Sequence, residues 1–246
     1  MVLPGGHSGL VRLSDCLKIG VSNALATTKE LTTIHQKHAD VLKEIRDAAR
    51  KCRENKSRSE TPEEIQSVAA RIPIEDAQTA VSLQGQLHSE TLSVILTSCF
   101  ALESYINSLA FFLMRERDLI GLVRNSTASA AGAFMDAFDK MSTTDKWKCI
   151  GNLKSESGFN IGEIPFQHIK ILFRFRDDHV HDKVVDWNSE RAQKRYNGKF
   201  PDPFGGVLAL SHAVFACDVY WEMICKIHDL VGVPVTGLIF LGQVEG

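Results

Sequence analysis

The chain has 246 residues, a formal net charge of −2, and hydrophobic and charged fractions of 44% and 24%, so it can bury a full core without a disulfide or metal staple. The small net charge excludes a protein that coats nucleic acid through bulk positive charge, although it is compatible with a local basic site. The six cysteines form no Cys-x-x-Cys pair and fall mostly at apolar positions of helical patterns, which indicates reduced thiols and neither a disulfide framework nor a zinc site.

A helical pattern begins near the N-terminus and extends from Leu10 to about Lys56. From Leu31 onward, mostly apolar residues recur at alternating spacings of three and four, which is typical of a coiled-coil-like stripe. The stripe contains Ile34, His38, Val41, Ile45, Ala48 and Cys52. Such a face either covers the core of its own chain or pairs with a second copy, and the short repeat favours the first interpretation.

The segment Glu54 to Thr61 is charged and free of large apolar residues, so we interpret it as a linker. Directly after it, Thr61, Pro62 and Glu64 supply an N-cap hydroxyl, a proline at the first helical position and a capping-box glutamate. A new helix is therefore predicted to start here. The chain divides into an N-terminal helical extension over 1–60, a helical bundle over 61–231 and a C-terminal tail over 232–246.

One long helix, or two in succession, is predicted from about Ile74 to Arg117. Its apolar positions form one continuous face, which is typical of the central helix of a bundle. This face contains Leu92, Ile95, Cys99, Leu102, Ile106, Leu109 and Leu113.

Shorter helices are predicted in the second half of the chain. Two of them span roughly Ala128 to Met141 and Thr144 to Lys154, the second preceded by the capping residues 142–144. Pro165 opens a third, which runs toward His181. A last helix over 207–230 is apolar on nearly every side, and we expect it to be deeply buried.

Sustained alternation of apolar and polar residues is missing, and the only strand-like stretch is Val233 to Leu241. We therefore predict an all-α fold. The N-terminus has no secretory signal, and the apolar run Leu230 to Leu241 is too short to span a bilayer. We expect a cytoplasmic protein that does not associate with a membrane.

The densest group of ionisable side chains lies at residues 174–183, where an apolar helix ends. As a solvated helix end, its acids and bases would pair at spacings of three and four, for example Asp178 with His181. A metal site is a second interpretation, but His179 and His181 lie about 200° apart around a helix and cannot chelate one ion. The run does not continue as the histidine pattern of metallo-β-lactamases, and the further ligands of an HD phosphohydrolase are missing. We expect no metal and no other cofactor.

RNA cleavage without a metal is a third interpretation of this group. Cleavage through the 2′-hydroxyl needs a base, an acid and a cation over the phosphate as charge develops. Histidine titrates near neutral pH, and arginine is a permanently charged, forked phosphate donor. One arginine and one histidine are therefore a minimal set of groups for this reaction.

Arg176, Asp177 and His181 follow the apolar run 171–173 and fit the order of an arginine, a polar residue and a later histidine. This order resembles the Arg-x4-6-His motif of HEPN domains, which are helical bundles, and the resemblance covers roughly residues 77–230. The segment 101–109 is similar to the earlier core helix of such domains. The resemblance implies that Glu103, or more weakly Asn107, supports the motif arginine.

The register of the motif has an alternative, because Arg174 with His179 also reads Arg-x4-His, and Arg174 with His181 would share one helix face. Arg176 is preferred because the polar residue Asp177 follows it. Arg174, His179 and Lys183 then become candidate RNA contacts. Positions five apart on a helix point about 140° away from each other, so Arg176 and His181 of one chain converge only if the helix ends between them.

The resemblance implies a metal-independent RNA endonuclease that serves as a toxin or an antiphage-defence effector. It implies a homodimer whose two facing motifs build one composite site, with an antitoxin or a larger defence complex as further partners. Arg176 would hold the scissile phosphate, His181 would act as acid or base, and Asp177 and Glu103 would orient them. The alternative, from a different class, is a non-catalytic helical interaction or scaffold protein with a HEPN-like fold.

Overall fold

The computed structural model describes residues 7–54, 63–115, 136–154, 158–180 and 208–232, and every regular element in these ranges is an α-helix. The prediction of an all-α fold is confirmed. The helices are α1 (His7–Lys37), α2 (Ala39–Glu54), α3 (Glu63–Ala69), α4 (Ile74–Arg115), α7 (Thr143–Lys154), α8 (Phe166–Val180) and α10 (Leu210–Val231).

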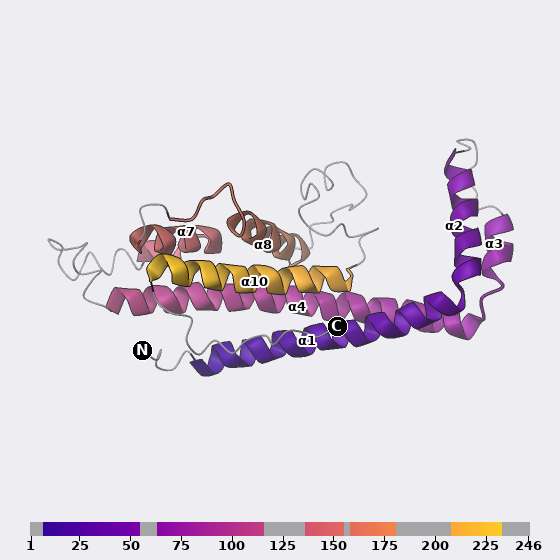
Figure 1. Cartoon of the computed structure of the whole chain (residues 1–246), viewed down its shortest axis with the longest axis horizontal. Coiled ribbons are helices and arrows are strands. Elements are labelled where there is room, and N and C mark those ends of the chain that lie inside the picture. Colours follow the sequence, from indigo (N-terminus) through magenta and orange to yellow (C-terminus); the bar gives the residue numbers. More distant parts are fainter. Residues whose placement is uncertain (1–6, 55–62, 116–135, 155–157, 181–207, 233–246) are drawn as a thin grey trace.

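The long helix α4 is the centre of the bundle, and it is a single helix over its whole length. Helix α1 packs along one side of α4 and α10 along another, while α7 and α8 pack on both α4 and α10 (Figure 1). Glu75 and Asp76 in the first turn of α4 favour its start, because the N-terminus of a helix carries partial positive charge. The predicted apolar face of α4 supplies much of the core: Ile95, Cys99, Leu102, Ile106 and Leu109 are all buried.

Helix α1 shares this core. Leu17 is fully buried in it, and Gly20 allows close contact with α4, since a Cβ atom at Gly20 would lie 2.6 Å from Cγ2 of Val94. Beyond the bundle, α1 and α4 continue together as a two-helix extension, which we define as residues 25–37 and 74–89 (Figure 1). Its small core contains Ala24, Leu31, Leu83 and Leu87.

The predicted continuous helix from Leu10 to Lys56 is interrupted at His38. Helix α1 ends at Lys37, and α2 turns away and packs against α3 (Figure 1). Asp76 holds this corner, because its Oδ2 lies 2.7 Å from both Lys37 Nζ and His38 Nε2. An ion pair between Arg71 and Glu44 joins α2 to the turn after α3. We call α2 and α3 together the arm; the coiled-coil-like stripe is therefore divided between the extension and the arm.

Several predicted boundaries can be compared with the helix ends. Helix α7 begins one residue before the predicted Thr144, and the hydroxyl of Ser142 caps it by accepting the Asp145 N–H at 3.2 Å. Helix α10 ends at Gly232, whose positive φ of 68° lets its N–H bond the carbonyl of His228. The linker over 55–62, most of the helix predicted over 128–141 and the tail over 233–246 lie outside the described residues.

Within the described ranges, one helical segment, Ile74–Ala110, is long and apolar enough by composition to cross a membrane. Half of its most apolar part is buried inside the protein. Because the core helix of a bundle has the same character, this segment is weak evidence for a membrane span.

Candidate functional site

The charged motif lies at the end of α8, whose apolar side chains anchor it in the bundle. The buried ones are Phe166, Ile169, Ile171, Leu172, Phe173 and Phe175. They pack α8 against α4 and α10. Arg176 follows directly and lies at the edge of this interface, where its side chain is 22% exposed.

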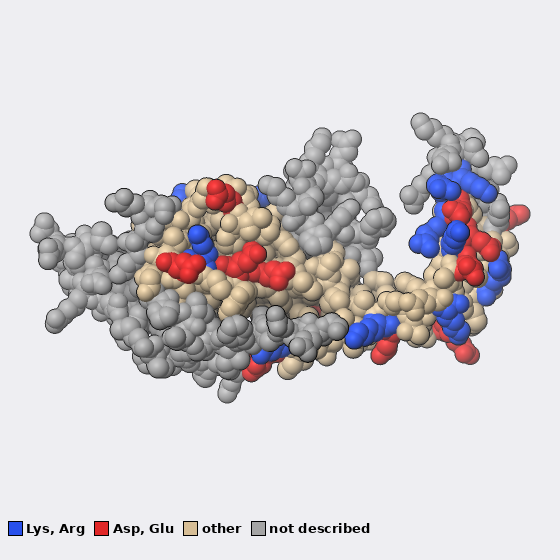
Figure 2. All heavy atoms as spheres, viewed as in Figure 1, with Lys and Arg blue, Asp and Glu red and all other residues tan. Residues whose placement is uncertain are grey.

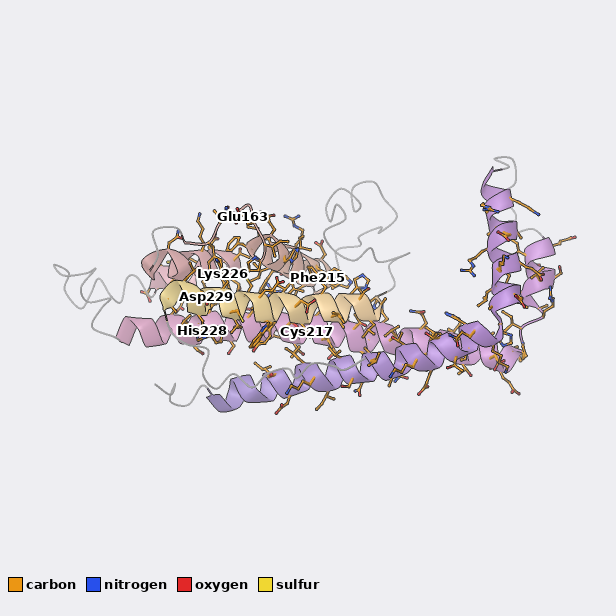
Figure 3. The ribbon with its side chains drawn as sticks, in the orientation of Figure 1. Glu163, Phe215, Cys217, Lys226, His228 and Asp229 are labelled. Atoms are coloured by element: carbon orange, nitrogen blue, oxygen red, sulfur yellow. The ribbon has the colours of Figure 1, made fainter. Side chains whose placement is uncertain are left out.

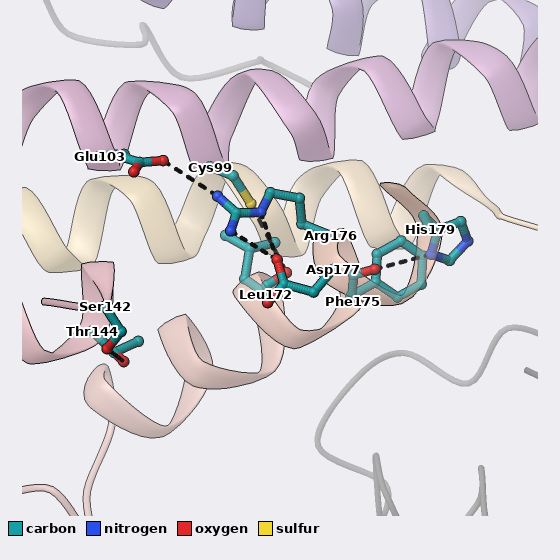
Figure 4. Close-up of polar contacts among 9 residues, drawn as sticks. All are labelled: Cys99, Glu103, Ser142, Thr144, Leu172, Phe175, Arg176, Asp177 and His179. Carbon is teal, nitrogen blue, oxygen red and sulfur yellow. Dashed lines mark hydrogen bonds and ion pairs between the residues drawn. The ribbon is translucent and has the colours of Figure 1, made fainter. Parts of the chain in front are cut away.

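Arg176 is bound by two carboxylates, one from each of two helices (Figure 4). Its Nη1 lies 3.3 Å from Oε2 of Glu103 on α4, 73 positions away in the sequence. Its Nε and Nη2 donate to Oδ1 of Asp177 at 3.0 and 2.7 Å. The structure therefore brings together three of the residues singled out from the sequence, and the guanidinium group is held from two directions.

Apolar groups complete the surroundings of the guanidinium group. Its Cζ lies 4.7 Å from the centre of the Phe173 ring, a cation–π distance. The thiol of Cys99, one turn before Glu103, donates to the Leu172 carbonyl at 3.9 Å. Burial raises the pKa of Cys99 to about 12, although the charge of Arg176 acts in the opposite direction. Cys99 is thus a neutral packing group beneath the ion pair.

Asn107, the weaker candidate for supporting Arg176, has another role. Its Oδ1 accepts a hydrogen bond from Nζ of Lys146 on α7 at 3.0 Å. Lys146 is itself buried, with its Nζ 5.3 Å from the centre of the Phe138 ring. Asn107 therefore compensates a buried ammonium group and joins α4 to α7.

His179 points away from Arg176 and packs on its own helix (Figure 4). Its ring stacks on Phe175, with 3.9 Å between centroids, and its Nδ1–H donates to the Phe175 carbonyl at 3.0 Å. Burial lowers the pKa of His179, and His88 on α4 acts in the same direction, whereas the Phe175 carbonyl and Asp178 act against it. A half-buried neutral imidazole in this position is a structural group, so His179 does not fit the role of an RNA contact.

Replacing His179 with asparagine is expected to make the stability of the protein less dependent on pH. The folded pKa lies below the unfolded value of about 6.5, so the unfolded chain binds more protons. The stability contributed by neutral His179 is present above that value and is lost as pH falls through it. Urea unfolding at about pH 7.5 and pH 5.5 should therefore show a smaller decrease in unfolding free energy for the variant than for wild type. The same substitution at exposed His35 should keep the wild-type decrease; equal decreases in all three proteins would contradict this assignment.

The remaining motif residues divide between described and undescribed positions. Arg174 is exposed, and Asp178 is buried with 2% exposure. His181 and Lys183 lie outside the described residues. Across the described ranges, no three histidine, cysteine or acidic side chains come close enough together to hold a metal ion.

An open cavity of about 600 Å³ lies elsewhere, between the loop 158–165 and α10. Glu163 and Lys226 contribute its charged side chains, and Figure 3 shows both on the upper side of the bundle. On α10, His228 bonds the hydroxyl of Tyr105. None of the motif residues lines this cavity, so it is separate from the Arg176 site.

The Arg176 site presents one partly exposed cation in a fixed orientation. A phosphate group could reach the guanidinium only by competing with Asp177, whose side chain is 44% exposed. Phe173 and Cys99 carry no chemical signal in the sequence. Only their spacing places them here, three residues before Arg176 and four before Glu103.

Comparison of the chain with protein-family models, with curated proteins and with solved structures finds no match.

Proposed function

We propose that the chain is a metal-independent RNA endonuclease of the HEPN class, with Arg176 and His181 as its catalytic residues. The proposal rests on the ion pair between Arg176 of α8 and Glu103 of α4. The resemblance of the motif implies this contact, and the two residues lie 73 positions apart in the sequence. A charged residue at a random surface position has no reason to meet a carboxylate from the central helix.

The geometry suggests how Arg176 would act. Glu103 and Asp177 fix the plane of its guanidinium group, and Phe173 supports one face. A prealigned cation stabilises the charge that develops on a phosphate more than a mobile one does. In this proposal Asp177 moves aside for the phosphate, while Glu103 keeps the arginine in position. His181 transfers the proton.

A single motif supplies one histidine, whereas the reaction needs both an acid and a base. We therefore propose a homodimer in which two motifs form one composite site, so that two histidines are present. RNA is the substrate, and an antitoxin or a larger defence complex would restrain or recruit the enzyme in the cytoplasm. The near-neutral net charge favours presentation of the RNA by such a complex over tight binding to naked RNA.

The proposal is tested by RNA cleavage in the presence of EDTA, with analysis of the product ends. Wild type is expected to give 2′,3′-cyclic phosphate ends, since the 2′-hydroxyl attacks without a metal. His181→Ala should remove this activity. His35→Ala is the matched control, because His35 lies exposed on α1, far along the sequence from the motif, and this variant should cleave like wild type. Equal cleavage by wild type and His181→Ala would exclude His181 as a catalytic residue.

A non-catalytic scaffold protein is the second candidate, and one observation favours it. The guanidinium group of Arg176 is already bonded to two carboxylates and covered on one face by Phe173, so it also serves as a structural tie between α8 and α4. Expression in a host distinguishes the two functions. Growth arrest by wild type and not by His181→Ala supports the nuclease, whereas no arrest by either, together with no cleavage in the assay above, supports the scaffold.

A further inference from the structure

The extension carries an exposed face of α4 that has no charged side chain. The exposed residues of α4 between Ala77 and Ser89 are Ala77, Gln78, Thr79, Val81, Ser82, Gly85, Gln86 and Ser89. Two large apolar side chains stand out on this side of the helix: Ile74 is 72% exposed and Val81 is 74% exposed. Figure 2 shows the contrast, with charged side chains crowded on the arm and few on the extension beside it.

Five positions of this face form one line along the helix. Ile74, Gln78, Val81, Gly85 and Ser89 follow one another at spacings of three and four, which places them on the same side of α4. The line is turned away from α1, since Leu83 and Leu87 point into the small core between the two helices. We call these five residues the outer stripe.

Gly85 is unusual within the outer stripe. A glycine in the middle of a helix destabilises it relative to alanine, because the unfolded chain loses more conformational freedom. No described contact of the chain requires it, since a Cβ atom at Gly85 would meet nothing within 4 Å. Gly20, by comparison, lies directly against Val94. Close approach of a helix from another molecule would give Gly85 the function that Gly20 has within the chain.

We propose that the outer stripe pairs with the outer stripe of a second copy of this chain, antiparallel and around a two-fold axis between Val81 and Ser82. The larger side chains, Ile74, Gln78 and Val81, occupy the first half of the stripe, and Gly85 and Ser89 occupy the second half. An antiparallel pair therefore places large residues against small ones.

The pairing opposes Ile74 to Ser89 of the partner subunit and Gln78 to Gly85 of the partner subunit. Because the face is uncharged, two identical copies meet without like-charge repulsion, which a partner of opposite charge would not require. The stripe is about 23 Å long, so the paired extensions would form a short four-helix bundle.

This interface is separate from the composite nuclease site of the proposed function. Glu103 lies on α4 about 30 Å from the two-fold axis, so the two Arg176 sites of such a pair would be about 60 Å apart. The extension interface can therefore exist whether or not the chain cleaves RNA, and its test uses assembly, not activity.

Analytical ultracentrifugation of the full chain tests the proposal. Wild type should dimerise, and Val81→Glu should raise the dimer Kd by at least about tenfold, because two carboxylates would meet near the axis. Ala26→Glu is the matched control, since it places the same charge at an exposed position of α1 in the same extension, and it should dimerise like wild type. Monomeric wild type at about 100 μM, where a specific pair would be populated, would overturn the proposal.

A second variant tests the orientation and does not depend on disrupting the interface. Val81→Cys should form a disulfide-linked dimer on mild oxidation, because the two copies of position 81 lie near the axis, whereas Ala26→Cys should not exceed the wild-type background. An unchanged dimer in Val81→Glu, or equal cross-linking at positions 81 and 26, would assign the dimer to another surface and overturn the proposal.

Discussion

Replacing Arg176 with lysine is expected to lower kcat for RNA cleavage by about 100- to 1,000-fold, the range found when one preorganised donor to a developing anion is removed. Lysine keeps the positive charge, but an ammonium group is a point charge without the forked, planar geometry of a guanidinium. It cannot bind Glu103 and Asp177 along two edges and stack on Phe173 at once. Single-turnover cleavage in EDTA measures the loss directly.

Arg71→Lys is the matched control for this experiment. Arg71 also forms an interhelical ion pair, with Glu44 of α2, but it belongs to the corner at the arm and not to the motif. Its variant should cleave RNA at the wild-type rate. Both variants should retain the wild-type helical circular dichroism. Wild-type cleavage by Arg176→Lys would show that the guanidinium geometry has no role in the reaction and would leave Arg176 as a structural residue.

Replacing Trp147 with alanine is expected to lower the free energy of unfolding by about 3 to 5 kcal/mol, as for other large aromatic residues removed from a core. Trp147 is fully buried on α7. Its ring stacks near Tyr105 of α4 at 6.1 Å and meets the edge of Phe159 at 6.3 Å. The indole therefore joins three parts of the bundle, and its loss leaves a cavity among rigid neighbours. Urea denaturation measures the change.

Phe100→Ala provides the comparison, because Phe100 is also aromatic but is 56% exposed on α4. Its removal should change the free energy of unfolding by no more than about 0.5 kcal/mol. Trp147→Phe should cost less than Trp147→Ala, since it keeps an aromatic ring and removes an indole N–H that has no hydrogen-bond partner among the described residues. A Trp147→Ala variant as stable as Phe100→Ala would show that α7 is not part of the cooperative core.

Much of the fold could be predicted because local patterns and tertiary packing agree. The apolar face around Leu102 and Ile106 has a helical period, and these residues are fully buried. The corner at His38 could not be predicted in the same way. The spacing from Ile34 through His38 to Val41 is what a continuous helix would show. The chain turns there because of contacts distant in sequence, above all the carboxylate of Asp76.

The candidate site shows the same division. Glu103 and Arg176 were singled out by resemblance, and the structure places them in contact; their catalytic role stays a prediction. The bond between Asn107 and Lys146 depends on how α7 packs against α4, and the spacing within one helix carries no information about that. The inward turn of His179 likewise depends on space beside Phe175 and His88.

The corner at Asp76 gives the arm the mechanical character of a lever. Helix α2 has 16 residues, so its far end is about 24 Å from the corner, and a rotation of about 10° there would move the tip by about 4 Å. The hydrogen bonds from Lys37 and His38 lower the pKa of Asp76, so the carboxylate stays ionised at any pH above its usual 3.8. One side chain thus sets the reach of the arm, and substitutions at the pivot would act on whatever touches the tip.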